Sequence, residues 1–201
     1  MIKVLDYGLG NIKAFINAYN RIDVPVKAIS DLKEIKDSDK LILPGVGHYD
    51  DAMIKLKKKF DLNILDNIVV QNKTPLLGIC VGMQILGVSS EEGKKKGLGW
   101  INSNVKRLIT DEHLILPHMG WNTLNFTKKD SILNGIHPKN NKLYFLHSFY
   151  LDCQQDIIIA STMYNINFPT VIKQDNIYGI QCHPEKSHGD GINILNNFSK
   201  L

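Results

Sequence analysis

The segment PLLGICVGMQIL, residues 75–86, carries a cysteine between two glycines at the point where an apolar run changes its period. PLLGI is typical of a buried strand, and VGMQIL has the spacing of the start of a helix. Cys80 therefore falls at a strand-to-helix turn, flanked by Gly78 and Gly82. A nucleophile in such an elbow takes a strained backbone conformation, and glycine neighbours let the strand and the helix approach closely. The segment predicts an α/β sheet with a nucleophilic cysteine at a strand end.

A helix beginning after Cys80 would favour a thiolate and offer backbone N–H groups to an oxyanion. A buried structural cysteine explains this motif alone equally well. A nucleophile needs a base, and YGIQCHPEKS, residues 178–187, contains His183 and Glu185. If this segment extends a strand, both side chains lie on one side, with Pro184 turned away. His183 would then move the thiol proton, and Glu185 would orient the imidazole.

Two neighbouring features bear on this chemistry. Cys182 is a competing nucleophile, but its side chain is expected to point opposite to that of His183 and it lacks a glycine elbow, so we interpret it as core. In LILPGVGHYD, residues 41–50, a strand ends in Pro44–Gly47. Glycines on both sides of Val46 would let its N–H turn toward a reacting carbonyl. An ordinary turn is the alternative for this motif alone.

Length and composition indicate one domain, because 201 residues with 43% hydrophobic and 22% charged residues can bury a substantial core. The N-terminus lacks a secretory pattern and no apolar run matches a membrane span, so we expect a cytoplasmic protein. Three cysteines without metal-ligand spacing, and the lack of a P-loop, predict no metal and no cofactor. The net charge of +4 comes largely from two lysine runs without aromatic residues, which does not indicate nucleic acid.

Apolar periodicity predicts alternating strands and helices in the first half and closely spaced strands in the second. Strands are expected at 2–8, 24–30, 40–45, 105–109, 113–121, 143–151 and 156–164. Helices are expected at 11–22, 50–71 and 191–201, with Asn11 near the first helix start. Residues 170–183 are expected to form a hairpin that turns at Asp175 and Asn176. The pattern predicts the α/β class with a mixed sheet.

Several motifs together resemble a known family. PGVGH, GICVGMQ and QCHPEKS resemble the triad-type, or class I, glutamine amidotransferases. DYGLGNIKAF, SEEG, PHMGWN and YFLHSFY are similar to segments of the glutaminase subunits of imidazole glycerol phosphate synthases. The resemblance runs from Met1 to the C-terminal helix. It implies one glutamine amidotransferase type 1 domain over residues 1–201, with a mixed, mostly parallel sheet flanked by helices.

The resemblance implies hydrolysis of L-glutamine to glutamate and ammonia through a thioester on Cys80, with His183 as acid and base and Glu185 as its partner. It assigns the oxyanion hole to Val46 and Val81. The residues that match glutamine-holding positions are Gly47, Gln84, Glu92, His147 and Ser148. Glutamine recognition needs acceptors for the α-amino group and donors for the carboxylate, which agrees with this set. Without the resemblance, Gln84 and Glu92 would be interpreted as surface residues.

The resemblance also implies a partner, because the chain leaves no acceptor domain for the ammonia. That partner is a (β/α)₈-barrel cyclase subunit in a heterodimer, which makes imidazole glycerol phosphate and aminoimidazole carboxamide ribotide for histidine biosynthesis. A closed ammonia passage is expected between the subunits. The PHMGW segment, with His118, Met119 and Trp121, is expected near the interface.

The sequence leaves three alternatives open. GLGWINSNVKRL, FYLDCQQD and HPEKSHGDG look closer to paralogues that supply ammonia to surface-polysaccharide or flagellar sugar pathways. Another α/β cysteine hydrolase or thiol sensor would use the elbow but would not require Glu185. A non-catalytic binding module is disfavoured, because nucleophile, base and acid are all present.

Overall fold

A central eight-stranded sheet organises the protein, which a computed structural model describes over residues 1–111 and 114–201. In their order across the sheet the strands are β2 (Val26–Ile29), β1 (Ile2–Leu5), β3 (Lys40–Gly45), β4 (Leu76–Cys80), β13 (Ile177–Ile180), β12 (Ile166–Gln174), β11 (Ile158–Tyr164) and β8 (Asn125–Phe126). The first five strands in this order, β2, β1, β3, β4 and β13, pair with their neighbours in parallel. The remaining pairs are antiparallel. The expected mixed, mostly parallel sheet is confirmed.

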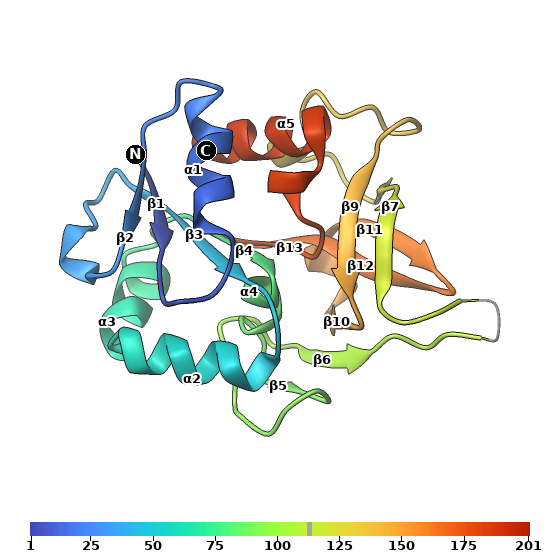
Figure 1. Cartoon of the computed structure of the whole chain (residues 1–201), viewed down its shortest axis with the longest axis horizontal. Coiled ribbons are helices and arrows are strands. Elements are labelled where there is room, and N and C mark those ends of the chain that lie inside the picture. Colours follow the sequence, from blue (N-terminus) through green and yellow to red (C-terminus); the bar gives the residue numbers. More distant parts are fainter. Residues whose placement is uncertain (112–113) are drawn as a thin grey trace.

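Helices cover both faces of this sheet (Figure 1). One face carries α1 (Ile12–Asn20) and α5 (His188–Ser199), and the other carries α2 (Tyr49–Lys59) and α3 (Leu62–Asp66). The π-helical turn η2 (Asn67–Gln71) follows α3, and α4 (Val81–Gln84) follows β4. The short 3₁₀ helices are η1 (Leu32–Glu34), η3 (Ser131–Leu133), η4 (Gln155–Ile157) and η5 (Pro184–Lys186).

Two small sheets accompany the main sheet. The first contains β10 (Phe149–Asp152), β6 (Asn104–Arg107) and β5 (Ser89–Ser90). The second pairs β7 (His118–Asn122) with β9 (Leu143–His147) in antiparallel fashion, and His118 lies opposite His147. Figure 1 shows β7 and β9 beside the antiparallel end of the main sheet.

Local sequence signals account for several elements. The central strands are near-continuous apolar runs because helices cover both faces, and all five residues of β4 are buried. The Asn11 side chain caps α1 by accepting a hydrogen bond from the Ala14 N–H at 3.2 Å, as expected. The predicted hairpin is confirmed, since Gln174 pairs with Ile177 and Asp175 takes a φ of 54°.

Other expected elements differ in extent. The helix expected over 50–71 is interrupted at Phe60, because Asp61 starts a new helix by accepting a hydrogen bond from the Asn63 N–H. The strand expected over 143–151 breaks at Ser148 into β9 and β10, which join different sheets. In the strand expected over 113–121, the first residue lies outside the described part, and pairing starts only at His118, after Pro117. The strands that pair with these segments are distant in the sequence, so local sequence alone does not set these bounds.

Within the described residues, no helix has the length and apolar character needed to cross a membrane.

Candidate active site

Cys80 occupies a strained turn between β4 and α4. Its backbone has φ 55° and ψ −116°, a conformation that a non-glycine residue adopts only when its surroundings hold it there. The two neighbouring glycines are required by packing. A Cβ atom on Gly78 would lie 2.7 Å from the Gly82 carbonyl oxygen, and one on Gly82 would overlap the Leu43 carbonyl oxygen. The expected elbow is present, although α4 is a single turn that ends at Gln84.

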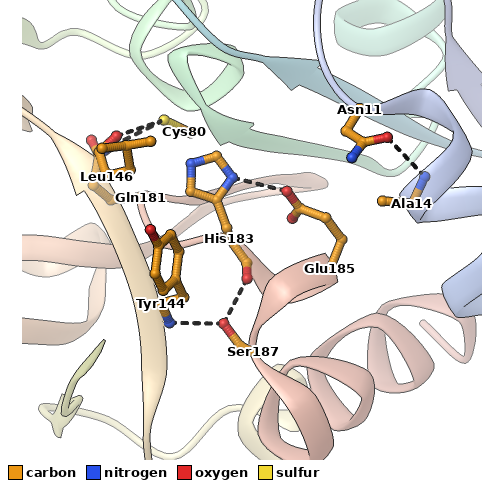
Figure 2. Close-up of polar contacts among 9 residues, drawn as sticks. All are labelled: Asn11, Ala14, Cys80, Tyr144, Leu146, Gln181, His183, Glu185 and Ser187. Carbon is orange, nitrogen blue, oxygen red and sulfur yellow. Dashed lines mark hydrogen bonds and ion pairs between the residues drawn. The ribbon is translucent and has the colours of Figure 1, made fainter. Parts of the chain in front are cut away.

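His183 and Glu185 are paired. The Nδ1 atom of His183 lies 2.9 Å from Oε1 of Glu185, and both side chains are 3% exposed. The expected reason for this contact is wrong, because the two residues do not lie on a strand. Pro184 begins the 3₁₀ helix η5, and His183 is the residue before it. The tight turn brings the carboxylate back to the imidazole (Figure 2).

The backbone of His183 is fixed from two sides. Its N–H donates to the carbonyl of Tyr144 on β9 at 2.8 Å. Its carbonyl accepts a hydrogen bond of 2.6 Å from the Ser187 hydroxyl, which in turn accepts one from the Tyr144 N–H at 2.9 Å. Figure 2 shows the two contacts of Ser187 and the second imidazole nitrogen on the side of Cys80. The imidazole therefore has one well-defined position.

The electrostatics of the pair favour a protonated imidazole. Burial by itself lowers the pKa of His183, but hydrogen bonds to Cys80 and Glu185 outweigh it and raise the pKa to about 10. The carboxylate stabilises the imidazolium that forms when the histidine takes a proton. This is the electrostatic arrangement of a base that accepts a thiol proton.

One cavity of about 300 Å³ collects the predicted site residues around the cysteine. Its lining consists of Val46, Gly47, Cys80, Val81, Gln84, Glu92, Pro117, Leu146, His147, Ser148, Phe149 and His183. Every residue expected in the oxyanion hole or the glutamine-holding set lines this cavity. Of the expected catalytic residues, only Glu185 lies outside the lining, behind the imidazole.

The strand that precedes Val46 runs directly beside the nucleophile. Gly45 lies opposite Cys80 in the β3–β4 register, and a Cβ atom on Gly45 would lie 2.5 Å from the Gly82 nitrogen. Gly47 has a φ of 99°, which favours glycine. The hydroxyl of the buried Tyr7 donates to the Pro44 carbonyl at 2.5 Å and holds the start of this segment. The turn is therefore anchored at Pro44.

Glu92 and His147 are held by backbone groups. Glu92 Oε2 accepts a hydrogen bond of 2.8 Å from the Tyr49 N–H at the N-terminus of α2, which leaves the other oxygen for the cavity. His147 Nδ1 donates to the Phe149 carbonyl at 2.8 Å. Burial, the larger cause, lowers the pKa of His147 to about 3, so this imidazole is neutral.

The other two cysteines do not resemble nucleophiles. Cys182 is fully buried and outside the cavity lining, and burial together with the charge of Glu185 raises the pKa of its thiol well above the usual value. Burial raises the pKa of Cys153 to about 12. Both thiols therefore stay protonated at neutral pH, which agrees with Cys182 as a core residue.

Sequence reasoning missed Gln181. Its side chain is fully buried, donates from Nε2 to Cys80 Sγ at 3.7 Å, and accepts from Gln84 Nε2 at 3.0 Å. The available signal was an amide inside the apolar run IYGIQC. Among residues 1–111 and 114–201, no group of three or more His, Cys, Asp or Glu side chains is arranged to hold a metal ion.

Comparison with known proteins agrees with this geometry. The model of the family described as "Glutamine amidotransferase class-I" matches residues 3–201. The fold is similar to that of PurLQS from Thermotoga maritima, with a TM-score of 0.72, 17% identity, and coverage of 98% of this chain and 96% of that one. The chain belongs to the class I glutamine amidotransferase family, and the predicted enzyme class is confirmed.

Closer relatives narrow the position within that family. Imidazole glycerol phosphate synthase subunit HisH from Leptospira borgpetersenii is 42% identical, and the HisH subunit from Bdellovibrio bacteriovorus is 43% identical. Each match covers 100% of both chains. The chain is thus a homologue of the HisH subunits, and the resemblance to the glutaminase subunits of these synthases is confirmed.

Proposed function

We propose that residues 1–201 form one amidotransferase domain that serves as the glutaminase subunit of an imidazole glycerol phosphate synthase. The main support for this proposal is the cavity around Cys80 and His183, in a chain that is similar over its full length to HisH subunits. L-Glutamine is the substrate, and glutamate and ammonia are the products. The ammonia passes to a (β/α)₈ cyclase subunit of the HisF type.

In the first half-reaction, His183 takes the proton of the Cys80 thiol, and the thiolate attacks the side-chain carbonyl of glutamine. The resulting oxyanion accepts hydrogen bonds from the backbone N–H groups of Val46 and Val81. When the C–N bond breaks, His183 returns its proton to the leaving nitrogen, which departs as ammonia. A γ-glutamyl thioester remains on Cys80.

In the second half-reaction, His183 takes a proton from water, and the hydroxide formed attacks the thioester carbonyl. The C–S bond breaks, the cysteine recovers its proton and glutamate leaves. Glu185 contributes to both halves by stabilising each imidazolium through its 2.9 Å contact. The raised pKa of His183 means that its imidazolium is stable in this site once it has taken a proton.

Substrate binding uses the polar groups of the cavity. Gln84 and Glu92 supply acceptors for the α-ammonium group of glutamine, and backbone N–H groups near Ser148 supply donors for its carboxylate. Glu92 is held in place by the N-terminus of α2. Gly47 lines the cavity with a φ of 99°, a conformation that other residues rarely adopt. Glycine at this position therefore leaves the cavity without a side chain on that side.

The outer face of β7 is our candidate surface for the cyclase. Met119 and Trp121 are 65% and 47% exposed, which is unusual for such large apolar side chains. His118 lies buried beneath them, so the contact surface comes from the other two residues. Ammonia released into neutral water is mostly ammonium, which is not nucleophilic. A closed passage from the cavity to the partner avoids this loss.

The test is to purify the chain with its natural barrel partner and to measure glutamate release and acceptor conversion together. Glutamine-dependent formation of imidazole glycerol phosphate from the phosphoribulosyl-formimino nucleotide supports the proposal. Glutamine hydrolysis without conversion of that acceptor would instead indicate a sugar-pathway paralogue. Peptide hydrolysis without glutaminase activity, and without labelling of Cys80 by a glutamine-like diazoketone, would indicate a different cysteine hydrolase.

A further inference from the structure

Gln181 connects the nucleophile to the glutamine-holding set. It follows β13, is fully buried, and contacts Cys80 on one side and Gln84 on the other. It does not line the cavity, so it is not placed to touch the substrate. Neither the expected catalytic residues nor the expected substrate-binding residues include it.

The orientation of both side-chain amides follows from one backbone carbonyl. The Phe149 carbonyl only accepts hydrogen bonds, so the Gln84 atom 2.9 Å from it is the nitrogen. That nitrogen also contacts Gln181 at 3.0 Å, and therefore meets its oxygen. The remaining atom of the Gln181 amide, its Nε2, then faces Cys80 Sγ at 3.7 Å. These three contacts together require that the sulfur of Cys80 faces an N–H donor of Gln181.

Two contacts of the sulfur favour opposite protonation states. The thiol donates weakly to the Leu146 carbonyl at 3.9 Å, a contact that only the neutral form makes. The Gln181 N–H donates to the sulfur, and such a bond strengthens when the acceptor carries a charge. Once the proton moves from Sγ to His183, the Leu146 contact is lost and the Gln181 contact becomes stronger.

The same amide fixes the group that faces the substrate. Both N–H donors of Gln84 are used, one by Phe149 and one by Gln181. The remaining polar atom of Gln84 is its Oε1, an acceptor, in a side chain that lines the cavity. Without Gln181, the Gln84 amide would have one fewer constraint on its rotation.

We propose that Gln181 is a positioning residue that stabilises the Cys80 thiolate through its N–H and holds the Gln84 acceptor toward the substrate's ammonium group. This proposal rests on the function proposed above. It predicts that the two effects separate in two variants. Gln181→Glu keeps an oxygen for Gln84 but presents a second oxygen, with negative charge, to the sulfur. Gln181→Met has a similar length and removes both contacts.

The experiment measures the pH dependence of iodoacetamide alkylation at Cys80 in the full chain, read by mass spectrometry of the Cys80 peptide. In Gln181→Glu, the pH of half-maximal alkylation should rise by about one to two units, because a hydrogen bond to a charged group is replaced by repulsion. Gln181→Met should show a smaller rise and an increased KM for glutamine. Gln174→Glu is the matched control, since Gln174 lies on the same hairpin and its side chain donates to the Trp100 carbonyl at 3.3 Å, away from Cys80 and Gln84.

The outcomes separate this proposal from the proposed function. Unchanged alkylation profiles and an unchanged KM in folded Gln181→Glu and Gln181→Met would overturn the role of Gln181, even if the wild-type chain hydrolyses glutamine. A raised alkylation pH in a chain that lacks glutaminase activity would support the role of Gln181 while contradicting the function. If Gln181→Glu fails to fold by circular dichroism, Gln181→Met alone decides the question.

Discussion

The Nδ1 atom of His118 lies 3.0 Å from the Nε2 atom of His147, so strand β7 is joined to the wall of the cavity. His147 donates from Nδ1 to the Phe149 carbonyl, and its Nε2 must therefore accept from His118. The other nitrogen of His118 then accepts from the Asn122 amide at 3.2 Å. The His118–His147 contact requires a neutral His147, and the Asn122–His118 contact requires a neutral His118. The full set of contacts therefore forms only when both imidazoles are neutral.

We predict that this pair makes the protein sensitive to acid. Burial lowers the pKa of His118 to about 4 and that of His147 to about 3, below the ordinary value of about 6.5. The unfolded state therefore binds protons that the folded state does not. This contribution to stability is complete above about pH 6.5 and is lost as the pH falls toward the folded pKa values.

The measurement is the free energy of unfolding in urea between pH 7.5 and 5. His118→Asn keeps a donor near His147 and removes one titrating group, so stability should fall less steeply with acidification than in the wild type. His137→Asn serves as control because His137 is exposed. An identical pH slope in His118→Asn and the wild type contradicts the assignment.

Cys80→Ala should abolish glutamine-dependent activity while the complex continues to use added ammonium salts, because only the nucleophile is deleted. Cys182→Ala should leave glutamine hydrolysis near the wild-type rate and cost about 1 kcal/mol of stability, since Cys182 is a fully buried thiol outside the cavity. Steady-state glutamate release and urea unfolding measure the two effects. Loss of activity in Cys182→Ala, with activity retained in Cys80→Ala, would reverse the choice of nucleophile.

Glu185→Gln should lower kcat by about 10²–10⁴-fold with a much smaller change in KM, because an amide still contacts His183 but no longer stabilises its charged form. The pKa of His183 should fall from about 10, since the carboxylate is one of the groups that raise it. NMR titration of the imidazole and steady-state kinetics test both parts. A rise in KM with kcat unchanged argues against this role.

Gly82→Ala should destabilise the protein by about 1–3 kcal/mol or more, because the added Cβ would overlap the Leu43 carbonyl oxygen. Gly189→Ala is the matched control. A Cβ there has nothing within 4 Å, and alanine favours the helix α5. Thermal unfolding of both variants gives the comparison, and equal melting temperatures would mean that the elbow tolerates a side chain at position 82.

Partner binding should raise kcat more than it lowers KM. Gly47 has a φ of 99° and open space around it, so the peptide next to it can adopt more than one orientation. If the partner aims the Val46 N–H at the oxyanion, activation of about 10²–10³-fold would follow from gaining one donor. Glutaminase turnover is compared for the chain alone, with partner, and with partner plus acceptor analogue.

Two results speak against this coupling. A kcat that stays constant across the three conditions excludes activation by the partner. Activation that persists in a folded Gly47→Pro complex excludes a rotating peptide as its cause, because proline fixes φ near −65°.

Short-range features of the site were predictable. The elbow at Cys80, the cap at Asn11 and the turn at Asp175 each depend on residues close in sequence, whose steric and hydrogen-bonding preferences act locally. The family motifs added the residues that we expect to hold glutamine, and these residues line one cavity around the cysteine. The contact of His183 with Glu185 was expected on the wrong local geometry, since proline starts a 3₁₀ turn there rather than continuing a strand.

The sequence by itself determined the α/β class and the strand-to-helix turn at Cys80, because apolar period and glycine spacing are local properties of the chain. Only the tertiary structure decided that Gln181 contacts both Cys80 and Gln84, and that His118 lies buried against His147. The chain separates Gln181 from these partners by 101 and 97 positions, and His118 from His147 by 29. Such contacts exist because buried polar groups must find partners when distant strands pack together, and no local pattern specifies which partner that will be.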